Sequence, residues 1–559
     1  MLLLNLDRVG KFYGTRAVFE NLSWALDEGV RVGLVGPNGA GKSSLLKVMA
    51  GSEPVEAGNV VARKGLRIAL LPQEVPAAEG STPLSVALEA RPDLAALEAD
   101  LAAVEAAFTD PATLADPDRW DALVEQQSRL LDTYETKGGP RLLNEATGLL
   151  KRLGFSAAEW QEPLPGMSGG QRKLAHLARC ILSGPDLLLL DEPDNHLDLT
   201  GKAFLEAVVR DFPGSVVIIS HDRYLLDNTV TGIAELLDGR LTLWDGNYSA
   251  YAVQKELALA RQQQDYVTQQ KEIKHLEEAV ARFKLWASMV IDERHIKQAR
   301  NKQRQIDSMD KVERPVLERR RIGFQLRAAQ RGGQKVIELR DVGKTYAGNG
   351  HGSVSVLDSV AGLVRHGDRI GIVGPNGAGK SVLFRLILGE EEPSAGAVWI
   401  GPSIRLGYYA QEHQTLDPNA TPLDTLRADG PLYEQQAIGM LGRFLFSYEA
   451  CRRPIHTLSG GEKARVQLAR LMLTGANCLL LDEPTNNLDI ASAEVLEQAL
   501  ADYSGTVVVI SHDRYFLDRV VDRIWEMKDG RLREYLGGWS AYADADRGYG
   551  HHGDTEARR

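Results

Sequence analysis

Short, continuous apolar runs, each followed at once by a polar or glycine-rich loop, recur in both halves of the chain. Val32–Val35 and Ile370–Val373 precede glycine-rich loops, whereas Leu187–Leu190 and Leu479–Leu481 end at acidic pairs. Runs of this length without alternation predict strands that are buried on both faces of a parallel sheet. We therefore expect an α/β fold. No run approaches the roughly 18 residues that a membrane-spanning helix requires.

Two further stretches carry helical patterns. Residues Leu94–Leu131 are rich in Ala, Leu, Glu and Asp at helical spacing, which predicts an added helical arm. Asn247–Ile322 contains no glycine and a single proline, Pro315, which favours long helices. Two helices of about 30 residues each would form a hairpin that reaches about 45 Å, with Trp286 near its tip. The alternative for this stretch is a solvated tether without a partner.

The two halves of the chain are copies of one another. Residues 36–43 and 374–381 share the sequence GPNGAGKS, 338 positions apart. Three later motifs, an SGG loop, a DEP loop and SHDRY, recur at an offset of 291 positions, so 47 extra residues lie between Gln73 and Met167, where the arm is expected. We predict a first domain over 1–246 with the arm at about 76–162, a linker over 247–334, a second domain over 335–543 and a disordered tail over 544–559.

Charge and cysteine content narrow the possible functions. The chain of 559 residues has a net charge of -11, but residues 250–335 alone carry +8, so a basic linker joins two acidic bodies. The three cysteines, Cys180, Cys451 and Cys478, form no CxxC pair, which argues against a disulfide framework, a zinc site or an iron–sulfur cluster. We expect them to be buried, in a reducing cytoplasm. The N-terminus lacks the basic start and apolar stretch of a secretory signal.

Each GPNGAGKS segment lies between an apolar strand and a helix, which is the context of a P-loop. Glycines there let successive backbone N–H groups turn inward around phosphate oxygens. Lys42 and Lys380 would reach the outer phosphates of ATP, and the hydroxyls of Ser43 and Ser381 would ligate Mg²⁺. The predicted ATP-binding residues of the two loops are Gly36, Pro37, Asn38, Gly39, Ala40, Gly41, Lys42, Ser43 and Ser44, and Gly374, Pro375, Asn376, Gly377, Ala378, Gly379, Lys380, Ser381 and Val382.

The acidic pairs end buried strands at the edge of the sheet where ligands bind in doubly wound folds. Asp191 and Asp482 would hold hydrated Mg²⁺ there. Glu192 and Glu483 are placed to orient and deprotonate the attacking water, as catalytic residues. The alternative for each of these four is a structural, salt-bridged carboxylate.

The order of P-loop, glutamine, SGG loop, DE pair and histidine resembles the ATP-binding cassette superfamily over both halves. The resemblance implies two P-loop cassette domains in tandem that sandwich two ATP molecules, each between the P-loop of one cassette and the SGG loop of the other. It assigns Gln73 and Gln411 to Mg²⁺, and His221 and His512 to the γ-phosphate as catalytic switch residues. The SGG residues implied at ATP are Ser459, Gly460, Gly461 and Glu462 at the first site, and Ser168, Gly169, Gly170 and Gln171 at the second.

Two tyrosines stand early in the cassettes, where this superfamily stacks an aromatic ring on adenine. They are Tyr13 and Tyr346. Core packing is the alternative for them, because Phe12 is adjacent to Tyr13.

Within the superfamily the chain resembles the ABC-F group. DEPDNHLD at 191–198 and DEPTNNLD at 482–489 are similar to that group's DEPTNHLD, and GNYSAY at 246–251 stands where its linker begins. The resemblance implies a cytoplasmic factor that binds the ribosomal exit site and contacts P-site tRNA through the linker, with an arm that some members direct at ribosomal protein or RNA. Asp194, Asn487 and Met167 depart from the group's pattern, but none removes a phosphate, Mg²⁺ or water ligand, so both sites are expected to be competent.

A basic face on the second linker helix fits contact with RNA. Its residues recur at spacings of two to four, so several can share one helical face and meet phosphates. They are Arg294, Lys297, Arg300, Lys302 and Arg304, with a further cluster at Arg319, Arg320 and Arg321. The alternative is a solvated charged helix.

We therefore expect an ATPase that closes around ATP, docks on the ribosome and leaves after hydrolysis, as a monomer whose cassettes form an intramolecular dimer. The main alternative is the ATPase subunit of a transporter with separate membrane subunits, which would need short coupling surfaces rather than a long hairpin. DNA repair or ribosome recycling would predict zinc or iron–sulfur cysteines, which this sequence lacks. Rescue of stalled ribosomes, sensing of energy charge and antibiotic resistance all stay open as roles.

Overall fold

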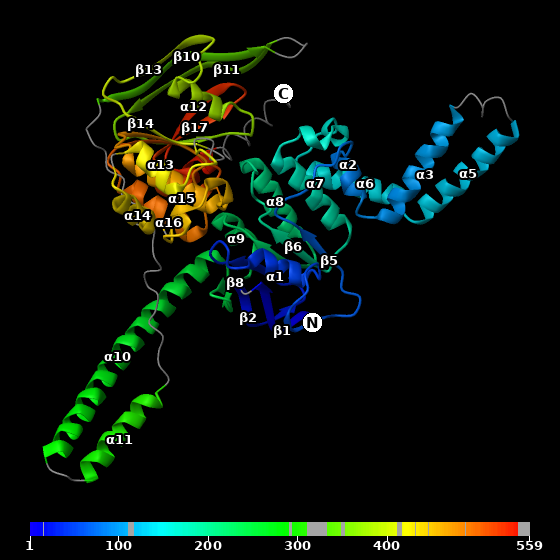
Figure 1. The fold of residues 1–559 in the computed structure, drawn as a ribbon. Helices are drawn as coiled ribbons and strands as arrows, with labels where there is room; N and C mark the ends of the chain where they lie inside the picture. The colour runs from blue at the N-terminus through cyan, green and yellow to red at the C-terminus, as the bar shows by residue number, and fades with distance from the viewer. Residues whose placement is uncertain are drawn as a thin grey trace.

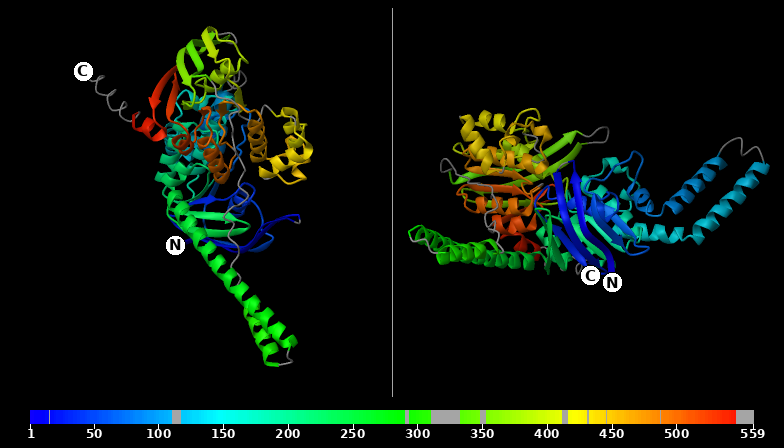
Figure 2. Two further views of the ribbon diagram at one scale, coloured as in Figure 1. Left: turned by 90° about the vertical axis from the view of Figure 1, so that its left-hand side faces the viewer. Right: turned by 60° about the horizontal axis from the view of Figure 1, so that its bottom comes forward.

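The computed structural model describes residues 1–14, 16–109, 117–289, 293–309, 333–347, 353–410, 416–430, 432–444, 446–486 and 488–545, with the backbone alone at 16, 117–118, 287–289 and 293–295. Two α/β bodies, the first and second cassettes, lie against each other, and two helical pairs project from them (Figure 1). One pair leaves the first cassette and the other connects the cassettes. Figure 2 shows the two pairs pointing away from the paired cassettes in different directions.

The first cassette contains a small antiparallel sheet and a larger sheet that is parallel except at one edge. The strand orders are β2-β1-β4 and β5-β6-β7-β3-β8-β9. Its strands are β1 (Leu2–Tyr13), β2 (Arg16–Asp27), β3 (Arg31–Val35), β4 (Ala57–Ala62), β5 (Ile68–Leu71), β6 (Leu187–Asp191), β7 (Ser215–Ile219), β8 (Gly232–Leu237) and β9 (Arg240–Asp245). Its helices are α1 (Lys42–Met49), α2 (Pro83–Leu88), α3 (Pro92–Phe108), α5 (Pro117–Thr136), α6 (Gly139–Arg152), α7 (Gly169–Leu182), α8 (Leu199–Asp211) and α9 (Arg223–Thr229).

The second cassette repeats both sheets strand for strand, in the orders β11-β10-β13 and β14-β15-β16-β12-β17-β18. Its strands are β10 (Lys335–Ala347), β11 (Ser353–Arg365), β12 (Arg369–Val373), β13 (Ala395–Ile400), β14 (Leu406–Tyr409), β15 (Cys478–Asp482), β16 (Thr506–Ile510), β17 (Arg523–Lys528) and β18 (Arg531–Leu536). Its helices are α12 (Lys380–Leu388), α13 (Pro422–Asp429), α14 (Glu434–Arg443), α15 (Gly460–Leu473), α16 (Ile490–Ala501) and α17 (Arg514–Val520). The duplication that the motifs predict is confirmed.

The larger sheet of the first cassette brings its motifs to one edge. β3 lies between β7 and β8, and β6 lies on the other side of β7, all of them parallel. β6 and β7 are buried along their whole length, as their continuous apolar sequences predict. The carboxyl ends of parallel strands meet at one sheet edge, so the P-loop after β3, the acidic pair after β6 and His221 after β7 come together there.

Apolar packing holds each cassette together and also joins the two. In the first cassette, one core contains Trp24 of the small sheet and Leu189 of β6, and a second contains the adjacent Leu188. Successive strand residues point to opposite faces, so β6 serves both cores. Leu199 of the first cassette packs against a core of the second, and Ile490 of the second packs against a core of the first.

The helix pair between the cassettes consists of α10 (Tyr248–Met289) and α11 (Glu293–Asp307). A helical hairpin was predicted and is found, but the expected two helices of about 30 residues each were wrong. α10 has 42 residues and α11 has 15. At 1.5 Å per residue α10 is about 63 Å long. Between Asn247 and Pro315 the sequence has no glycine or proline to mark the helix ends, which is why the helix lengths were not predicted. Trp286, expected near the tip, lies three residues before the end of α10, as predicted. Pro315 and Arg319–Arg321 lie outside the described residues.

The helical arm of the first cassette is the pair α3 and α5. The helical prediction for Leu94–Leu131 is confirmed over the described residues. The ring of Phe108 on α3 meets that of Trp120 on α5 edge-on, with centroids 4.8 Å apart. The flanking α2 and α6 have counterparts in α13 and α14 of the second cassette, so the inserted residues correspond to α3 and α5 alone.

Candidate functional site

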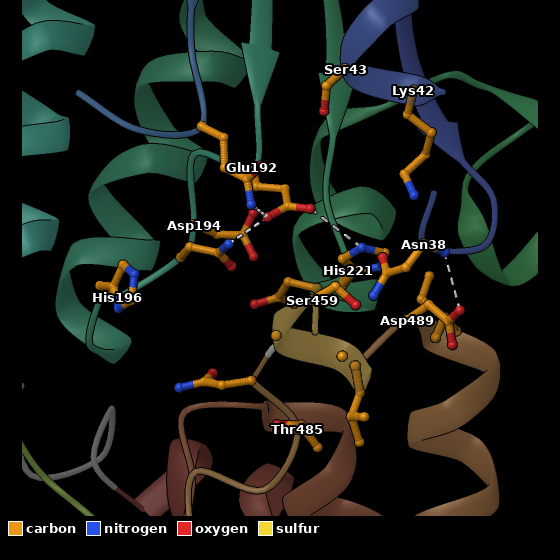
Figure 3. A pocket seen from close by; sticks show the side chains of 18 of the residues that line it. Asn38, Lys42, Ser43, Glu192, Asp194, His196, His221, Ser459, Thr485 and Asp489 are labelled. Atoms are coloured by element: carbon orange, nitrogen blue, oxygen red, sulfur yellow. Dashed lines mark hydrogen bonds and ion pairs between the residues drawn. The ribbon is translucent and has the colours of Figure 1, made fainter. Parts of the chain in front are cut away.

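A cavity of about 2430 Å³ lies between the cassettes and is lined by residues from both. Figure 3 shows part of it, where Ser459 and Asp489 of the second cassette face Asn38, Glu192 and His221 of the first. The predicted residues that line the cavity are Tyr13, Pro37, Asn38, Gly39, Ala40, Gly41, Lys42, Ser43, Ser44, Gln73, Ser168, Gly169, Glu192, His221, Asn376, Gly377, Gly379, Lys380, Ser381, Val382, Ser459, Gly460, Gly461, Glu462, Asp482, Glu483 and His512. The two copies of the motif set therefore meet in one space.

Each P-loop lysine is held by its own loop. Helix α1 begins at Lys42, whose Nζ donates to the carbonyl oxygens of Gly36 (2.9 Å) and Pro37 (3.1 Å). Lys380 makes the equivalent contacts in the second copy, at 2.7 and 2.9 Å. A Cβ atom on Gly36 would lie 2.3 Å from the carbonyl oxygen of Leu236. Only glycine therefore lets the chain leave β3 along this path.

Each acidic pair begins with a buried aspartate beside the P-loop serine. Burial raises the pKa of Asp191 and raises that of Asp482 to about 6. The hydroxyl of Ser43 acts to lower the pKa of Asp191, and that of Ser381 acts to lower the pKa of Asp482, but burial outweighs both. The Oδ1 atom of each aspartate is buried without a hydrogen-bond partner. Such oxygens beside hydroxyl groups fit Mg²⁺, which takes one or two carboxylates together with substrate phosphates and water.

Glu192 is oriented by three side chains. Its Oε2 accepts hydrogen bonds from Gln73 Nε2 (2.8 Å) and Asn195 Nδ2 (2.6 Å). Its Oε1 lies 3.6 Å from Nε2 of His221, an ion-pair distance. Burial acts to raise the pKa of Glu192, but the facing His221 and the ammonium of Lys42 outweigh it, so the pKa is lowered. The structure thus places Gln73 and His221 next to the ionised carboxylate of Glu192.

The corresponding glutamate of the second cassette has different surroundings. Oε2 of Glu483 accepts from the backbone N–H of His512 at 3.3 Å, and its Oε1 lies 3.5 Å from Nε2 of the same residue. Burial and the neighbouring Asp482 raise the pKa of Glu483 to about 8. Burial, with the charges of Lys380 and Lys202, lowers the pKa of His512 well below its usual value. The same motif therefore has a different charge state in each copy.

Each P-loop contacts an aspartate of the opposite cassette. Oδ2 of Asp489 accepts from the backbone N–H of Asn38 at 3.3 Å, and Oδ2 of Asp198 accepts from that of Asn376 at 3.2 Å. The other oxygen of each aspartate caps a helix, α16 for Asp489 and α8 for Asp198. A capping side chain fixes the position of the helix start. The two cassettes therefore meet head to tail, with a helix N-terminus at each opposing P-loop.

Both SGG loops end in a capping box. Ser168 caps α7 while the Gln171 side chain returns to the Ser168 backbone, and Ser459 and Glu462 do the same for α15. The N-termini of α7 and α15 stand at the cavity, where backbone N–H groups and the helix dipole favour an anion. Gln171 and Glu462 thus position the loops by their capping bonds.

A reciprocal set of buried ion pairs crosses the interface next to the switch histidines. Arg223 of the first cassette pairs with Glu497 of the second, and Arg514 of the second pairs with Glu206 of the first. The guanidinium of Arg223 also lies 4.1 Å from the ring centroid of Tyr515. Sequence analysis missed these residues. The repeated SHDRY motif was the available signal, but its partners lie 274 and 308 positions away along the chain.

The remaining predicted residues differ in whether they line the cavity. The Tyr13 hydroxyl lies 3.2 Å from Ser44 Oγ, whereas Tyr346 donates a hydrogen bond to Glu391 away from the cavity lining. Predicted residues that do not line the cavity are Gly36, Gly170, Gln171, Asp191, Gly374, Pro375 and Ala378. Gln411, Asn487 and the side chain of Arg294 lie outside the described residues. Cys180, Cys451 and Cys478 are buried and unpaired in disulfides, as expected.

The basic residues of α11 form a face directed away from α10. Lys297, Arg300 and Arg304 are exposed and recur every three or four residues, which places them on one side of the helix. Ala299 and Ile306 are buried on the opposite side. Lys302 is half-buried between the two sides.

The chain is similar to known proteins over nearly its whole length. A family model described as ABC transporter matches residues 19–195 and 357–486, and a second with the same description matches 234–324. Energy-dependent translational throttle protein EttA of Escherichia coli K12 is 34% identical over 554 residues, which cover 96% of this chain and 95% of that protein. ABC transporter F family member 5 of Arabidopsis thaliana is 33% identical over 548 residues, covering 97% of this chain and 77% of that protein.

Solved structures share the tandem arrangement. The archaeal ribosome recycling factor aABCE1, crystallised with the archaeal ribosomal stalk protein aP1, gives a TM-score of 0.59 at 19% identity and covers 94% of this chain and 89% of that one. At that identity the likeness concerns the fold alone. Across the described ranges, no helix combines the length with the apolar character needed to cross a membrane.

Proposed function

Because the chain belongs to the ABC-F family of ATP-binding cassette proteins and is an ATPase, we propose that it is a translation factor that binds the ribosome with its cassettes closed on ATP and leaves after hydrolysis. The relative EttA is named as a translational throttle protein. The single observation that carries the proposal is the head-to-tail contact of each P-loop with the opposite cassette. A ligand in the cavity would touch both cassettes at once.

The chemistry at the first site follows from its side chains. We assign Lys42 to the outer phosphates of ATP and Ser43, Asp191 and Gln73 to Mg²⁺. When bound, Mg²⁺ would neutralise charge on the β- and γ-phosphate oxygens. Glu192, held in place by hydrogen bonds and ionised, would accept a proton from the attacking water. Lys380, Ser381 and Asp482 would take the same binding roles at the second site. Glu483, whose pKa is raised to about 8, would accept the proton there only after losing its own.

Closure would follow from shared binding. Each ATP would lie between the P-loop of one cassette and the SGG helix of the other, so ATP has a higher affinity for the closed form and shifts the population toward it. Hydrolysis removes the γ-phosphate that contacts the SGG helix. The nucleotide would then no longer favour the closed form over the open form.

The buried ion pairs between the cassettes should support closure. Replacing Arg223 by Ala leaves Glu497, which is buried, without its partner from the other cassette, and losing one member of a buried pair at an interface costs about 2–5 kcal/mol. We expect R223A to need at least about tenfold more ATP for half-maximal closure, measured by energy transfer between dyes on the two cassettes. R519A is the matched control, because Arg519 pairs with the same Glu497 within one cassette and is 51% exposed. Equal ATP dependence of R223A and R519A would contradict this role.

We further propose that the helical hairpin reaches RNA, at the exit site and the P-site tRNA. Its first helix, α10, is about 63 Å long, which is longer than any other helix in the described part of the chain. Near the tip Trp286 is 44% exposed, and the guanidinium of Arg282 lies 5.9 Å from its ring. Aromatic rings and guanidinium planes stack on unpaired bases, and exposed cations meet phosphates. The aromatic tip and the basic face of α11 together support recognition of RNA.

Removing the basic face should weaken ribosome binding and leave ATP hydrolysis intact. The variant K297A/R300A/R304A is expected to bind ribosomes more weakly, with a salt dependence reduced by about one unit of log–log slope for each phosphate that the variant no longer neutralises. Sedimentation with purified ribosomes over a range of salt concentrations measures both. The control R427A/R443A/R533A removes three exposed charges of the second cassette. Binding by the α11 variant that equals the control at every salt concentration would defeat the assignment.

A further inference from the structure

Two buried charged residues of the first cassette have uncharged counterparts in the second. Lys202, on the first turn of α8, is replaced in the second copy by Ala493 on α16, at the same offset of 291 positions. Asp194 of the first DEP loop is likewise replaced by Thr485. Lys202, Asp194 and Ala493 are all buried. The first cassette thus carries two opposite charges where the second has uncharged side chains.

Lys202 reaches across the interface. Its Nζ donates to the Asp222 carboxylate of its own cassette at 2.9 Å and to the backbone carbonyl oxygen of His512 in the other cassette at 2.9 Å. Asp198, one helical turn earlier on the same face of α8, contacts the P-loop of the second site through Asn376. Two residues of one helix therefore hold two different parts of the second site.

At the first site the equivalent helix makes only one of these contacts. Asp489, at the start of α16, reaches the P-loop through Asn38. One turn later stands Ala493, whose methyl side chain has no hydrogen-bond donor. The carbonyl oxygen of His221 therefore receives no ammonium from that position.

The Lys202 ammonium is compensated where it lies. Burial acts to lower its pKa, but Asp222, Asp194 and Asp513 outweigh burial and raise it, so the group stays charged. Asp222 also has a second cation, since Arg514 approaches it to 3.5 Å. Asp194 has an Oδ1 atom without a hydrogen-bond partner. Lys202 is thus the main counter-charge for Asp194, and a variant that removes both together should keep its fold.

We propose that Lys202 is a positioning residue for the second ATP site, fixing the switch histidine His512 from the opposite cassette, and that the two sites consequently turn over at unequal rates. The carbonyl held by Lys202 belongs to the residue whose backbone N–H and imidazole both face Glu483. Lys202 reaches that carbonyl only while the cassettes are together, so the second site is complete only in the closed form. This inference rests on the proposed roles of Glu192 and Glu483.

The test uses backgrounds in which one site turns over. E192Q leaves the second site active, and E483Q leaves the first. Into each we place D194T/K202A, which gives the first cassette the residues that the second cassette carries at these positions. In the E192Q background we expect kcat to fall about tenfold to a hundredfold with KM for ATP little changed, because misplacing a group at a reacting centre costs rates of that order. In the E483Q background kcat should change by less than about twofold.

Several outcomes separate the inference from its alternatives. Thermal unfolding of D194T/K202A at the temperature of the unaltered chain would show that the fold is kept. An equal fall in kcat in both backgrounds would make the Lys202–Asp222 pair a purely structural contact and would overturn the proposal. An unchanged kcat in the E192Q background would also overturn it. Failure of the proposed function has a different signature, which is undiminished hydrolysis by E192Q/E483Q without any change at Lys202.

Discussion

Replacing Glu192 and Glu483 by glutamine is expected to lower ATP hydrolysis about a hundredfold to ten-thousandfold, the usual contribution of a positioned general base. ATP should still bind. The substituted side chain has the same shape, and its amide oxygen can accept the hydrogen bonds that Gln73 and Asn195 donate to Glu192. What is lost is the negative charge of Glu192 and, at both positions, the ability to take a proton from water. Steady-state phosphate release at saturating ATP measures the effect.

The matched control makes the same chemical change elsewhere. E135Q/E449Q replaces two exposed carboxylates outside the cavity and alters the net charge by the same amount. We expect the control to hydrolyse ATP at the rate of the unaltered chain. Hydrolysis by E192Q/E483Q at the control's rate would remove both glutamates from the mechanism.

The same variant tests the proposed partner. A chain that binds ATP and cannot hydrolyse it should stay closed, so E192Q/E483Q is expected to migrate with ribosomes on a sucrose gradient in ATP and not in ADP. Deletion of residues 281–304 should abolish the comigration while ATP binding persists. Enrichment of E192Q/E483Q in membranes instead of ribosomes would point to a transport ATPase.

The parts of the site that sequence predicted are those built from consecutive residues. A P-loop is a strand, a glycine loop and a helix in a row, so GPNGAGKS was sufficient to place Lys42 and Ser43. The acidic pair comes directly after a buried strand, so it could also be placed from consecutive residues. Parallel strands then bring these local pieces to one edge of the sheet.

The parts that sequence missed depend on residues that meet only after folding. Arg223 and Glu497 lie 274 positions apart, and the residue pattern of neither α9 nor α16 predicts their contact. The substitution of Asp194 was visible, but its counter-charge Lys202 stands on the next helix and points to the other cassette. The unequal charge states of Glu192 and Glu483 likewise arise from surroundings that identical motifs do not encode.

Pairs of substitutions should show which P-loop shares its ATP with which SGG loop. If the first site combines Lys42 with Ser459, then K42A/S459E damages one site twice and the chain still binds about one ATP, because the second site is independent. K42A/S168E damages both sites and should bind none. A glutamate at the N-terminus of α7 or α15 both fills space and repels phosphate at the end of the helix that favours anions.

The two combinations control for each other, since each carries one lysine-to-alanine and one serine-to-glutamate change. Equilibrium binding of labelled ATP in the E192Q/E483Q background gives the number bound per chain without turnover. Figure 3 places Ser459 opposite His221 and Glu192, which is the arrangement that makes K42A/S459E the milder variant. The opposite ranking, with K42A/S168E keeping one ATP, would mean that each cassette binds its nucleotide alone. ATP would then bridge nothing, and closure would need another cause.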